Sequence, residues 1–311
     1  MLTVINQVEE VQGKNGEIRA GGTDLHDRYR AGVSTGPIVD IHKISSLNTI
    51  SQAADNSTTI GALVSIDTVG NDPIITTHYT GLAQTANGLA TPQIRWAASL
   101  GGGLLQRTRC AYYRHPDLSC TKKGDDVCGG REGHHPNGVI FDRGGCSHAH
   151  PSSLAIALLA YDATVKTATR TMPIADLYGD GSDHGRDHLL ADDELLTHIV
   201  LPPPVPNEKT AYFRSISRFE AEWPIVECMV RLGIEDGVIV HAAVGAGGIS
   251  QIPMRLSHAE TALIGKAATA ENMASAAETA AEGATPLPQA AWKADMLVGT
   301  LLTTLEMALT D

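Results

Sequence analysis

Aromatic side chains, positive charge and long apolar runs are all scarce in this sequence. Aromatic residues make up 4% of the 311 residues, so a core has to be built mainly from Ala, Leu, Ile and Val. The 23 Lys and Arg stand against 35 Asp and Glu, which gives a net charge of −12. Nucleic-acid binding calls for clustered Lys and Arg, and an anionic membrane surface also attracts basic segments. The composition therefore argues against both as partners.

Membrane-crossing and export signals are absent as well. No apolar run approaches the roughly 18 residues that a membrane-spanning helix needs. The N-terminus, MLTVINQVEEVQGKNGE, lacks the basic and apolar regions of a signal peptide. We therefore expect a cytoplasmic protein with reduced thiols, and co-export to the periplasm with a signal-bearing partner stays open. A chain of this length can bury a sizeable core and is expected to form two domains.

Two glycine turns stand out in the N-terminal two thirds of the chain. The first lies in EIRAGGTDL at 17–25, which predicts a strand, a turn and a helix running through Arg30, and the second is SLGGG at 99–103. Successive backbone N–H groups in such turns form a concave anion site, and a following helix N-terminus favours phosphate. Thr23 and Asp24 are expected to cap the first helix. The two glycine turns together indicate a phosphate-binding site. For the first turn alone, an ordinary capped turn between a strand and a helix is the alternative.

Four of the five cysteines follow the second turn, at Cys110, Cys120, Cys128 and Cys146. They lie in a segment, residues 107–150, that is rich in Gly, His and charge and poor in aliphatic residues. Such a segment cannot offset its ordering entropy by burial, whereas metal binding can supply folding free energy. The spacings lack the close Cys pairs typical of zinc and fit a cubane iron–sulfur cluster. Zinc, no metal, or a His replacing one Cys ligand remain alternatives.

The remaining segments predict a mixed helix and strand layout. Short strands and a helix from Thr80 to Ile94 precede the second turn, and Pro202–Pro206 forms a stiff linker that serves as the domain boundary. Beyond the linker we expect a small antiparallel sheet with helices packed on one side, an α+β arrangement. Other predicted elements are a helix at 154–163, strands at 164–167, 193–201, 211–217, 225–233 and 237–244, and helices at about 255–265, 270–283 and 288–309.

Two C-terminal features have structural interpretations. Cys228 stands in an apolar strand and is expected in the core rather than at a metal. The glycines of GAGG at 245–248 do not complete a dinucleotide-binding pattern, because Ser250 replaces the third glycine. This stretch therefore predicts a tight turn.

Several motifs together resemble a known family. They are AGGTDL at 20–25, SLGGGLLQR at 99–107, HPSSLAIALLAYDA at 150–163, ELLTHIVLP at 194–202 and GAGGISQIPMRLSHAETALIG at 245–265. They resemble the FAD-binding medium subunit of the xanthine dehydrogenase family of molybdenum hydroxylases, over nearly the whole chain. The RTRC…C…C…C insertion resembles the branch with an extra 4Fe–4S cluster, as in periplasmic aldehyde oxidoreductase and 4-hydroxybenzoyl-CoA reductase.

The resemblance implies a fold and a cofactor site. The fold is α+β: a PCMH-type (vanillyl-alcohol-oxidase-like) FAD-binding domain of two subdomains at 1–201, with the iron–sulfur insertion at 107–150, and a C-terminal flavoprotein domain at 207–311. The four cysteines would hold the cluster. Gly103 stands where the family has Asn. Ser153 stands where it has Asp, and the loss of that carboxylate would remove a hydrogen bond to the cofactor and lower FAD affinity. The residues implied in FAD binding are Ala20, Gly21, Gly22, Thr23, Asp24, Leu25, Ser99, Leu100, Gly101, Gly102, Gly103, Gln106, Ser153, Leu196 and Arg214.

The implied function is electron transfer in a multi-subunit molybdenum hydroxylase. A large subunit would oxidise an aldehyde or N-heterocycle at a molybdopterin centre, and a small subunit with 2Fe–2S clusters would pass electrons to the FAD of this chain. An external acceptor would then take them, so the chain itself carries no catalytic acid or base. The 4Fe–4S cluster is expected to lie off the main electron-transfer path from the 2Fe–2S clusters to FAD. The three subunits are expected to form a heterotrimer or a multimer of it. A stand-alone FAD oxidase and a zinc-stabilised binding module are the alternatives.

Overall fold

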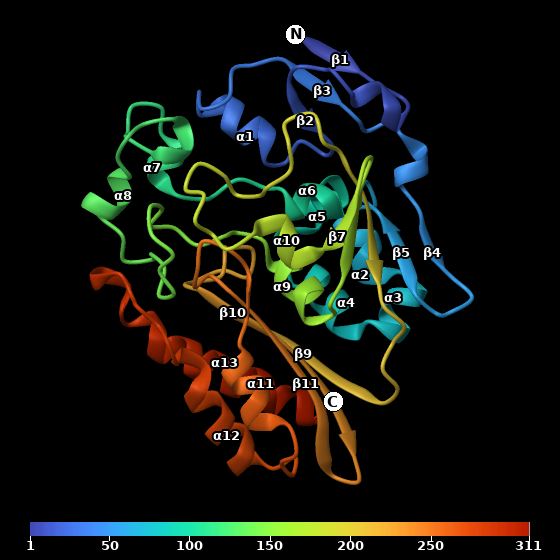
Figure 1. The fold of residues 1–311 in the computed structure, drawn as a ribbon, viewed down its shortest axis with the longest axis vertical. Coiled ribbons are helices and arrows are strands. Elements are labelled where there is room, and N and C mark those ends of the chain that lie inside the picture. Colours follow the sequence, from blue (N-terminus) through green and yellow to red (C-terminus); the bar gives the residue numbers. More distant parts are fainter. Residues whose placement is uncertain (311) are drawn as a thin grey trace.

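A computed structural model describes residues 1–310 and arranges them in three β-sheets with surrounding helices (Figure 1). The first sheet is parallel, and its strand order is β1-β3-β2. A small apolar core beneath it includes Ile5 and Val39. The elements are β1 Leu2–Val4, η1 Val8–Val11, β2 Glu17–Arg19, α1 Leu25–Arg30, β3 Ile38–Asp40 and η2 Ser45–Leu47.

The second sheet is antiparallel and has the order β4-β5-β8-β6-β7. Its strands come from both sides of the cysteine segment in sequence, because β5 pairs with β8 and β8 pairs with β6. The strands are β4 Ile50–Gln52, β5 Thr58–Gly61, β6 Thr164–Thr167, β7 Thr171–Pro173 and β8 Leu196–Leu201. The helices of this part are α2 Ile66–Asn71, α3 Pro73–His78, α4 Thr80–Asn87, α5 Pro92–Ala97, α6 Leu100–Leu104, α9 Ser153–Ala160 and α10 Ile174–Tyr178.

The third sheet is C-terminal and antiparallel, in the order β12-β11-β10-β9. Residues 226–233 of β10 are all buried, because α13 packs on one face of the sheet and α9 on the other. Its elements are β9 Glu208–Ser215, β10 Val226–Glu235, β11 Val238–Gly247, β12 Met254–Arg255, α11 Ser257–Leu263, α12 Ala270–Glu278, η4 Thr279–Ala281, η5 Pro288–Ala290 and α13 Lys293–Thr310. The predicted antiparallel sheet with helices on one side is confirmed.

Helix α9 joins the second and third parts of the fold. Every residue of its sequence SLAIALLA is buried, as expected for a helix that is apolar all round. It packs against α4 and against β10 and β11. Strand β11 comes so close that a Cβ atom on Gly245 would lie 2.2 Å from the carbonyl oxygen of Ile156. Glycine at this position therefore permits the contact between strand and helix.

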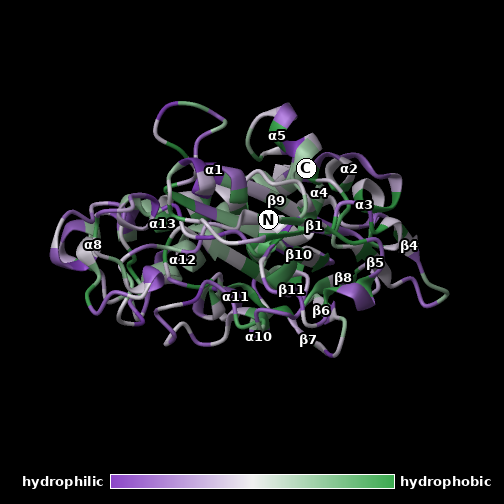
Figure 2. Ribbon diagram, turned by 90° about the horizontal axis from the view of Figure 1, so that it is seen from above, coloured by the Kyte–Doolittle hydropathy of each residue, from purple (hydrophilic) through white to green (hydrophobic). Residues whose placement is uncertain are grey.

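The cysteine segment forms no sheet strand. It contains only the short turns α7 Ala111–Arg114, η3 Thr121–Lys123 and α8 Gly129–Glu132, drawn in green beside α1 and the start of α13 (Figure 1). Its buried apolar cluster consists of Cys110, Tyr113 and Cys120. Figure 2 shows hydrophilic colouring over much of this region, around α8. The prediction that aliphatic packing contributes little holds for the part of the segment that carries Cys110, Cys120 and Cys128, whereas Val139 and Ile140 are fully buried in the core of the third sheet.

One predicted helix starts where expected but is too long. The expected helix from Thr80 to Ile94 ends at Asn87, and a separate helix, α5, begins at Pro92. Pro92 has no N–H to continue a helix but fits the first position of a new one, and the Thr91 side chain caps it. The expected turn after β11 is present, with Gly248 at φ +76°. Among residues 1–310 we find no helix with the length and apolar character to cross a bilayer.

Candidate functional site

A cleft of about 820 Å³ lies between the first sheet and the helices of the second part. Its size is within the range of small-molecule and cofactor sites. Both glycine turns contribute to its walls, although they are far apart in sequence. The predicted cofactor residues that line it are Ala20, Gly21, Gly22, Thr23, Asp24, Leu25, Ser99, Gly101, Gly102, Gln106 and Leu196.

The first glycine turn connects β2 to α1 and offers unpaired backbone donors. Gly22 has φ +74°, a conformation that favours glycine. A Cβ on Gly21 would lie 1.7 Å from the carbonyl oxygen of Ala97, so glycine is needed where this turn meets the end of α5. Within residues 1–310, the N–H groups of residues 21–24 donate no hydrogen bond to another protein atom. Such successive donors at a cleft wall form an anion-binding surface.

The second glycine turn is built differently. The Ser99 hydroxyl accepts a hydrogen bond from the Gly102 N–H at 3.2 Å and caps α6. The N–H groups of Leu100, Gly101 and Gly103 donate to backbone carbonyl oxygens of the protein at 2.8–2.9 Å. Leu100 and Gly103 are buried behind the cleft wall. This turn therefore presents a wall without side chains at Gly101 and Gly102, and the expectation of free donors there is wrong.

Besides Leu100 and Gly103, two more residues that the resemblance assigns to the cofactor do not line this cleft. Ser153 opens α9, is buried, and its hydroxyl has no hydrogen-bond partner in the described part of the chain. Arg214 lies on β9, and its guanidinium donates to the backbone carbonyl oxygens of Glu220 and Glu222. Ser153 lies at the start of α9, which packs on β10 and β11, and Arg214 lies on β9, which packs against α4 and α13, so both are away from the cleft.

Asp24 does not cap α1, contrary to the prediction. Its carboxylate instead pairs with Arg28 at 3.1 Å, Arg109 at 2.9 Å and Arg114 at 2.6 Å. Burial alone would raise the pKa of Asp24, but the charges of Arg109, Arg114 and Arg28 outweigh it and lower the pKa. Two of these arginines belong to the cysteine segment. One carboxylate therefore connects the first glycine turn to that segment.

The four cysteines of the segment come together in the fold. All are buried and none forms a disulfide within residues 1–310. Hydrogen bonding with Cys146 lowers the pKa of Cys128 to about 4, and the same contact raises that of Cys146. Burial raises the pKa of Cys110 and Cys120, and nearby Cys128 adds to both shifts. The thiols thus share one region, although the described residues contain no group of three or more His, Cys, Asp or Glu side chains placed for a single metal ion.

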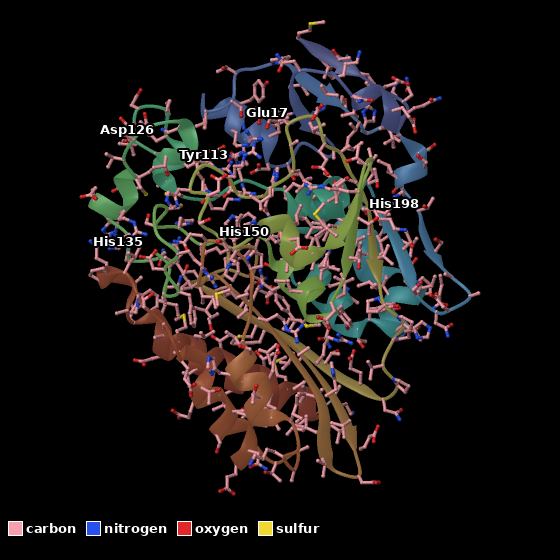
Figure 3. The ribbon with its side chains drawn as sticks, in the orientation of Figure 1. Glu17, Tyr113, Asp126, His135, His150 and His198 are labelled. Carbon is pink, nitrogen blue, oxygen red and sulfur yellow. The ribbon has the colours of Figure 1, made fainter. Side chains whose placement is uncertain are left out.

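A thin wall of side chains separates the cysteines from the cleft. Tyr113 packs against Cys110 and Cys120 and also lines the cleft. Figure 3 shows it where the green cysteine segment meets the blue N-terminal part. Lys122 lines the cleft as well, and it lines a cavity of about 90 Å³ whose wall includes Cys146. Sequence reasoning did not single out either residue, because only the tertiary contact reveals their position.

Asp187 is a further residue that the sequence did not indicate. It is 6% exposed, and its carboxylate pairs with Lys122 at 3.0 Å and with Arg107 at 2.8 Å. Burial alone would raise its pKa, but the two cations lower it. Burial lowers the pKa of nearby His150 and of His188 to about 4, so both are neutral at pH 7. The residues around Asp187 in the sequence are acidic and rich in glycine, which is typical of an exposed loop. The sequence therefore did not predict that Asp187 is buried and paired with Lys122 and Arg107.

Comparison with known proteins identifies families and relatives that this chain resembles. Residues 3–204 match the family described as FAD binding domain in molybdopterin dehydrogenase, and residues 211–296 match the CO dehydrogenase flavoprotein C-terminal domain. The aldehyde oxidoreductase FAD-binding subunit PaoB of Escherichia coli (strain K12) is 28% identical over 253 residues, 78% of either chain. The nicotinate dehydrogenase FAD-subunit of Eubacterium barkeri is 26% identical over 265 residues, 82% of this chain and 74% of the relative.

Solved structures share the fold over nearly the whole chain. A carbon monoxide dehydrogenase from Hydrogenophaga pseudoflava superposes with a TM-score of 0.77 and 19% identity, covering 99% of this chain and 96% of that one. Quinoline 2-oxidoreductase from Pseudomonas putida 86 gives a TM-score of 0.77 and 18% identity, with the same coverage. The predicted α+β fold is therefore confirmed.

Proposed function

Because the chain belongs to the family of FAD-binding domains in molybdopterin dehydrogenases, we propose that it is the electron-transfer FAD subunit of a multi-subunit molybdenum hydroxylase. The family resemblance expected from the sequence motifs is confirmed. Two relatives are named as FAD subunits of an aldehyde oxidoreductase and a nicotinate dehydrogenase. By analogy, an aldehyde or N-heterocycle is oxidised on a large molybdopterin subunit, and a small 2Fe–2S subunit delivers the electrons to this chain.

The cleft between the two N-terminal parts is the observation that carries this proposal. The unpaired N–H groups of residues 21–24 suit the pyrophosphate of FAD, and Gly101 and Gly102 let the cofactor approach the opposite wall. Gln106 and Leu196 line the same cleft and complete the set of contacts. Bound FAD would supply redox chemistry, while the chain binds and orients it and tunes its surroundings.

The four cysteines are proposed to hold a 4Fe–4S cluster. They are buried together in a segment whose own apolar cluster contains Tyr113 and two of the cysteines. Cluster binding would supply the folding free energy that the segment lacks. Thiolate ligands scattered along a loop suit such a cluster. The same proposal divides the chain into a domain at 1–201 and one at 207–311, because β8 belongs to the second sheet and β9 to the third.

Substrate-driven reduction tests the function. The chain is purified anaerobically with its co-purifying subunits and, separately, alone, and each sample receives an aldehyde or nicotinate without an electron acceptor. We expect the flavin absorbance to bleach only in the complex, together with molybdenum in the metal analysis. Bleaching of the isolated chain by the same substrates would instead support a stand-alone FAD oxidase and contradict the proposal.

A further inference from the structure

We propose that Lys122 is the charged residue that raises the reduction potential of the cysteine-bound cluster, and that Asp187 is the counter-ion that offsets part of its charge. The inference rests on the proposed cluster and concerns how the chain tunes it. The fold buries the Lys122 side chain next to the cysteines. Lys122 follows Cys120 by two residues, and its side chain turns inward so that 4% of it is exposed.

Lys122 faces both redox sites of the proposed function. Its side chain lines the FAD cleft and also the small cavity that Cys146 borders. The ammonium group donates to Asp187 at 3.0 Å and to the backbone carbonyl oxygen of Arg186. These contacts fix the charge in the wall between the cleft and the cysteines, where solvent screening is weak.

The charges around this wall do not cancel. Asp187 carries one negative charge and faces two cations, Lys122 and Arg107. On the far side of the cysteines, Arg131 and Asp142 form a bidentate pair at 2.9 and 2.7 Å, which compensates itself. Lys122, Arg107 and Asp187 together therefore carry one excess positive charge. The Asp125 carboxylate also lies beside a cysteine, where it accepts a hydrogen bond from the Cys120 N–H at 2.7 Å, but it is exposed and screened by solvent. The charge on a cluster becomes more negative on reduction, so a nearby fixed cation favours the reduced state and raises the potential.

The neighbouring Lys123 provides a matched control. Its ammonium group points along the surface of the loop and donates to the backbone carbonyl oxygens of His115 and Leu118. Changing Lys123 to Met removes the same charge from the adjacent position in the sequence. A general effect of net charge would move the potential equally in both variants, whereas a local effect of Lys122 would not.

The experiment is a reductive titration of the anaerobically purified complex, followed by the EPR signal of the reduced cluster. Iron and FAD content are measured first in each sample. We expect K122M to shift the midpoint potential to a more negative value, K123M to shift it less in the same direction because Lys123 lines neither cavity, and D187N to shift it to a more positive value. D187N removes the negative charge that offsets Lys122 and keeps the shape of the side chain.

Opposite shifts are a signature that a merely structural role would not produce. The proposal is overturned if K122M, with full iron content, keeps the wild-type potential, or if K122M and K123M shift it equally. Should K122M fail to retain iron, the D187N result decides: a wild-type or more negative potential overturns the proposal. A wild-type complex whose iron is fully accounted for by the 2Fe–2S clusters of the small subunit would instead refute the cluster itself, and a complex with iron but no FAD would refute the flavin site.

Discussion

The carboxylate of Asp24 should be the main connection between the first glycine turn and the cysteine segment. An Asp24→Asn substitution keeps the shape of the side chain and removes its charge. The guanidinium groups of Arg28, Arg109 and Arg114 then lose their shared anion in a region where each is 10–20% exposed. Removing one partner of a buried ion pair costs about 3–5 kcal/mol. With partial solvent screening at this site, we expect a loss of about 2–4 kcal/mol.

Asp27 offers the matched control on the same helix. It is 50% exposed and contacts Arg114 at 3.2 Å, so an Asp27→Asn substitution should cost less than about 1 kcal/mol. Urea unfolding of samples with equal FAD and iron content measures both costs, and limited proteolysis within 107–150 reports release of the segment. Equal stabilities and equal proteolysis rates in the two variants would refute this account of Asp24.

The Asp24 contribution should also depend on pH in a defined direction. Its pKa is lowered in the folded state, so its contribution is fully present above the unfolded value of about 3.9. The contribution is lost as pH falls through the lower folded pKa. The stability difference between wild type and Asp24→Asn should therefore be constant from about pH 5 to pH 8 and shrink below about pH 4. A difference that vanishes near neutral pH would contradict this assignment.

Three other predictions concern the cleft, the cysteines and a buried histidine. Gly21→Ala places a Cβ 1.7 Å from a backbone oxygen, so FAD should bind at least about tenfold more weakly by fluorescence titration. Gly299→Ala, in α13 away from the cleft and with open space around it, should not change the affinity. Cys128→Ser should lower iron content while Cys228→Ser, in the core of β10, retains it; equal iron in both would exclude Cys128 as a ligand. Because burial lowers the pKa of His150 to about 4, the unfolded chain binds its proton first, and stability should fall as pH drops from about 6.5 to 4. His150→Gln should flatten that dependence, and an unchanged slope would contradict it.

Local signals explain which parts of the site the sequence could predict. Glycines between a strand and a helix mark a turn by backbone chemistry alone, so Gly21–Gly22 and the second turn were found. A cysteine-rich segment with few aliphatic residues is also visible in composition, and the structure brings its four cysteines together. The C-terminal sheet and helices followed from hydrophobic periodicity and agree with the structure.

Tertiary pairing explains what the sequence could not predict. In the second turn, the N–H groups of Leu100 and Gly101 donate to the carbonyl oxygens of Val64 and Ala62, which no local pattern shows. Asp24 matches a helix cap in sequence, but arginines from the cysteine segment take its carboxylate. Asp187 stands in a loop-like stretch, and its burial depends on Lys122 and Arg107. Sequence patterns thus located the turns and the thiols, and only the fold revealed the charges that connect them.

The central claim is that one chain holds FAD in the cleft and a 4Fe–4S cluster at its buried cysteines, side by side. Quantifying FAD, iron and acid-labile sulfide in the anaerobically purified wild-type chain, with Mössbauer spectra of the iron, tests it most directly. The account predicts one FAD and one 4Fe–4S cluster per chain. A folded chain that contains neither flavin nor iron would contradict it.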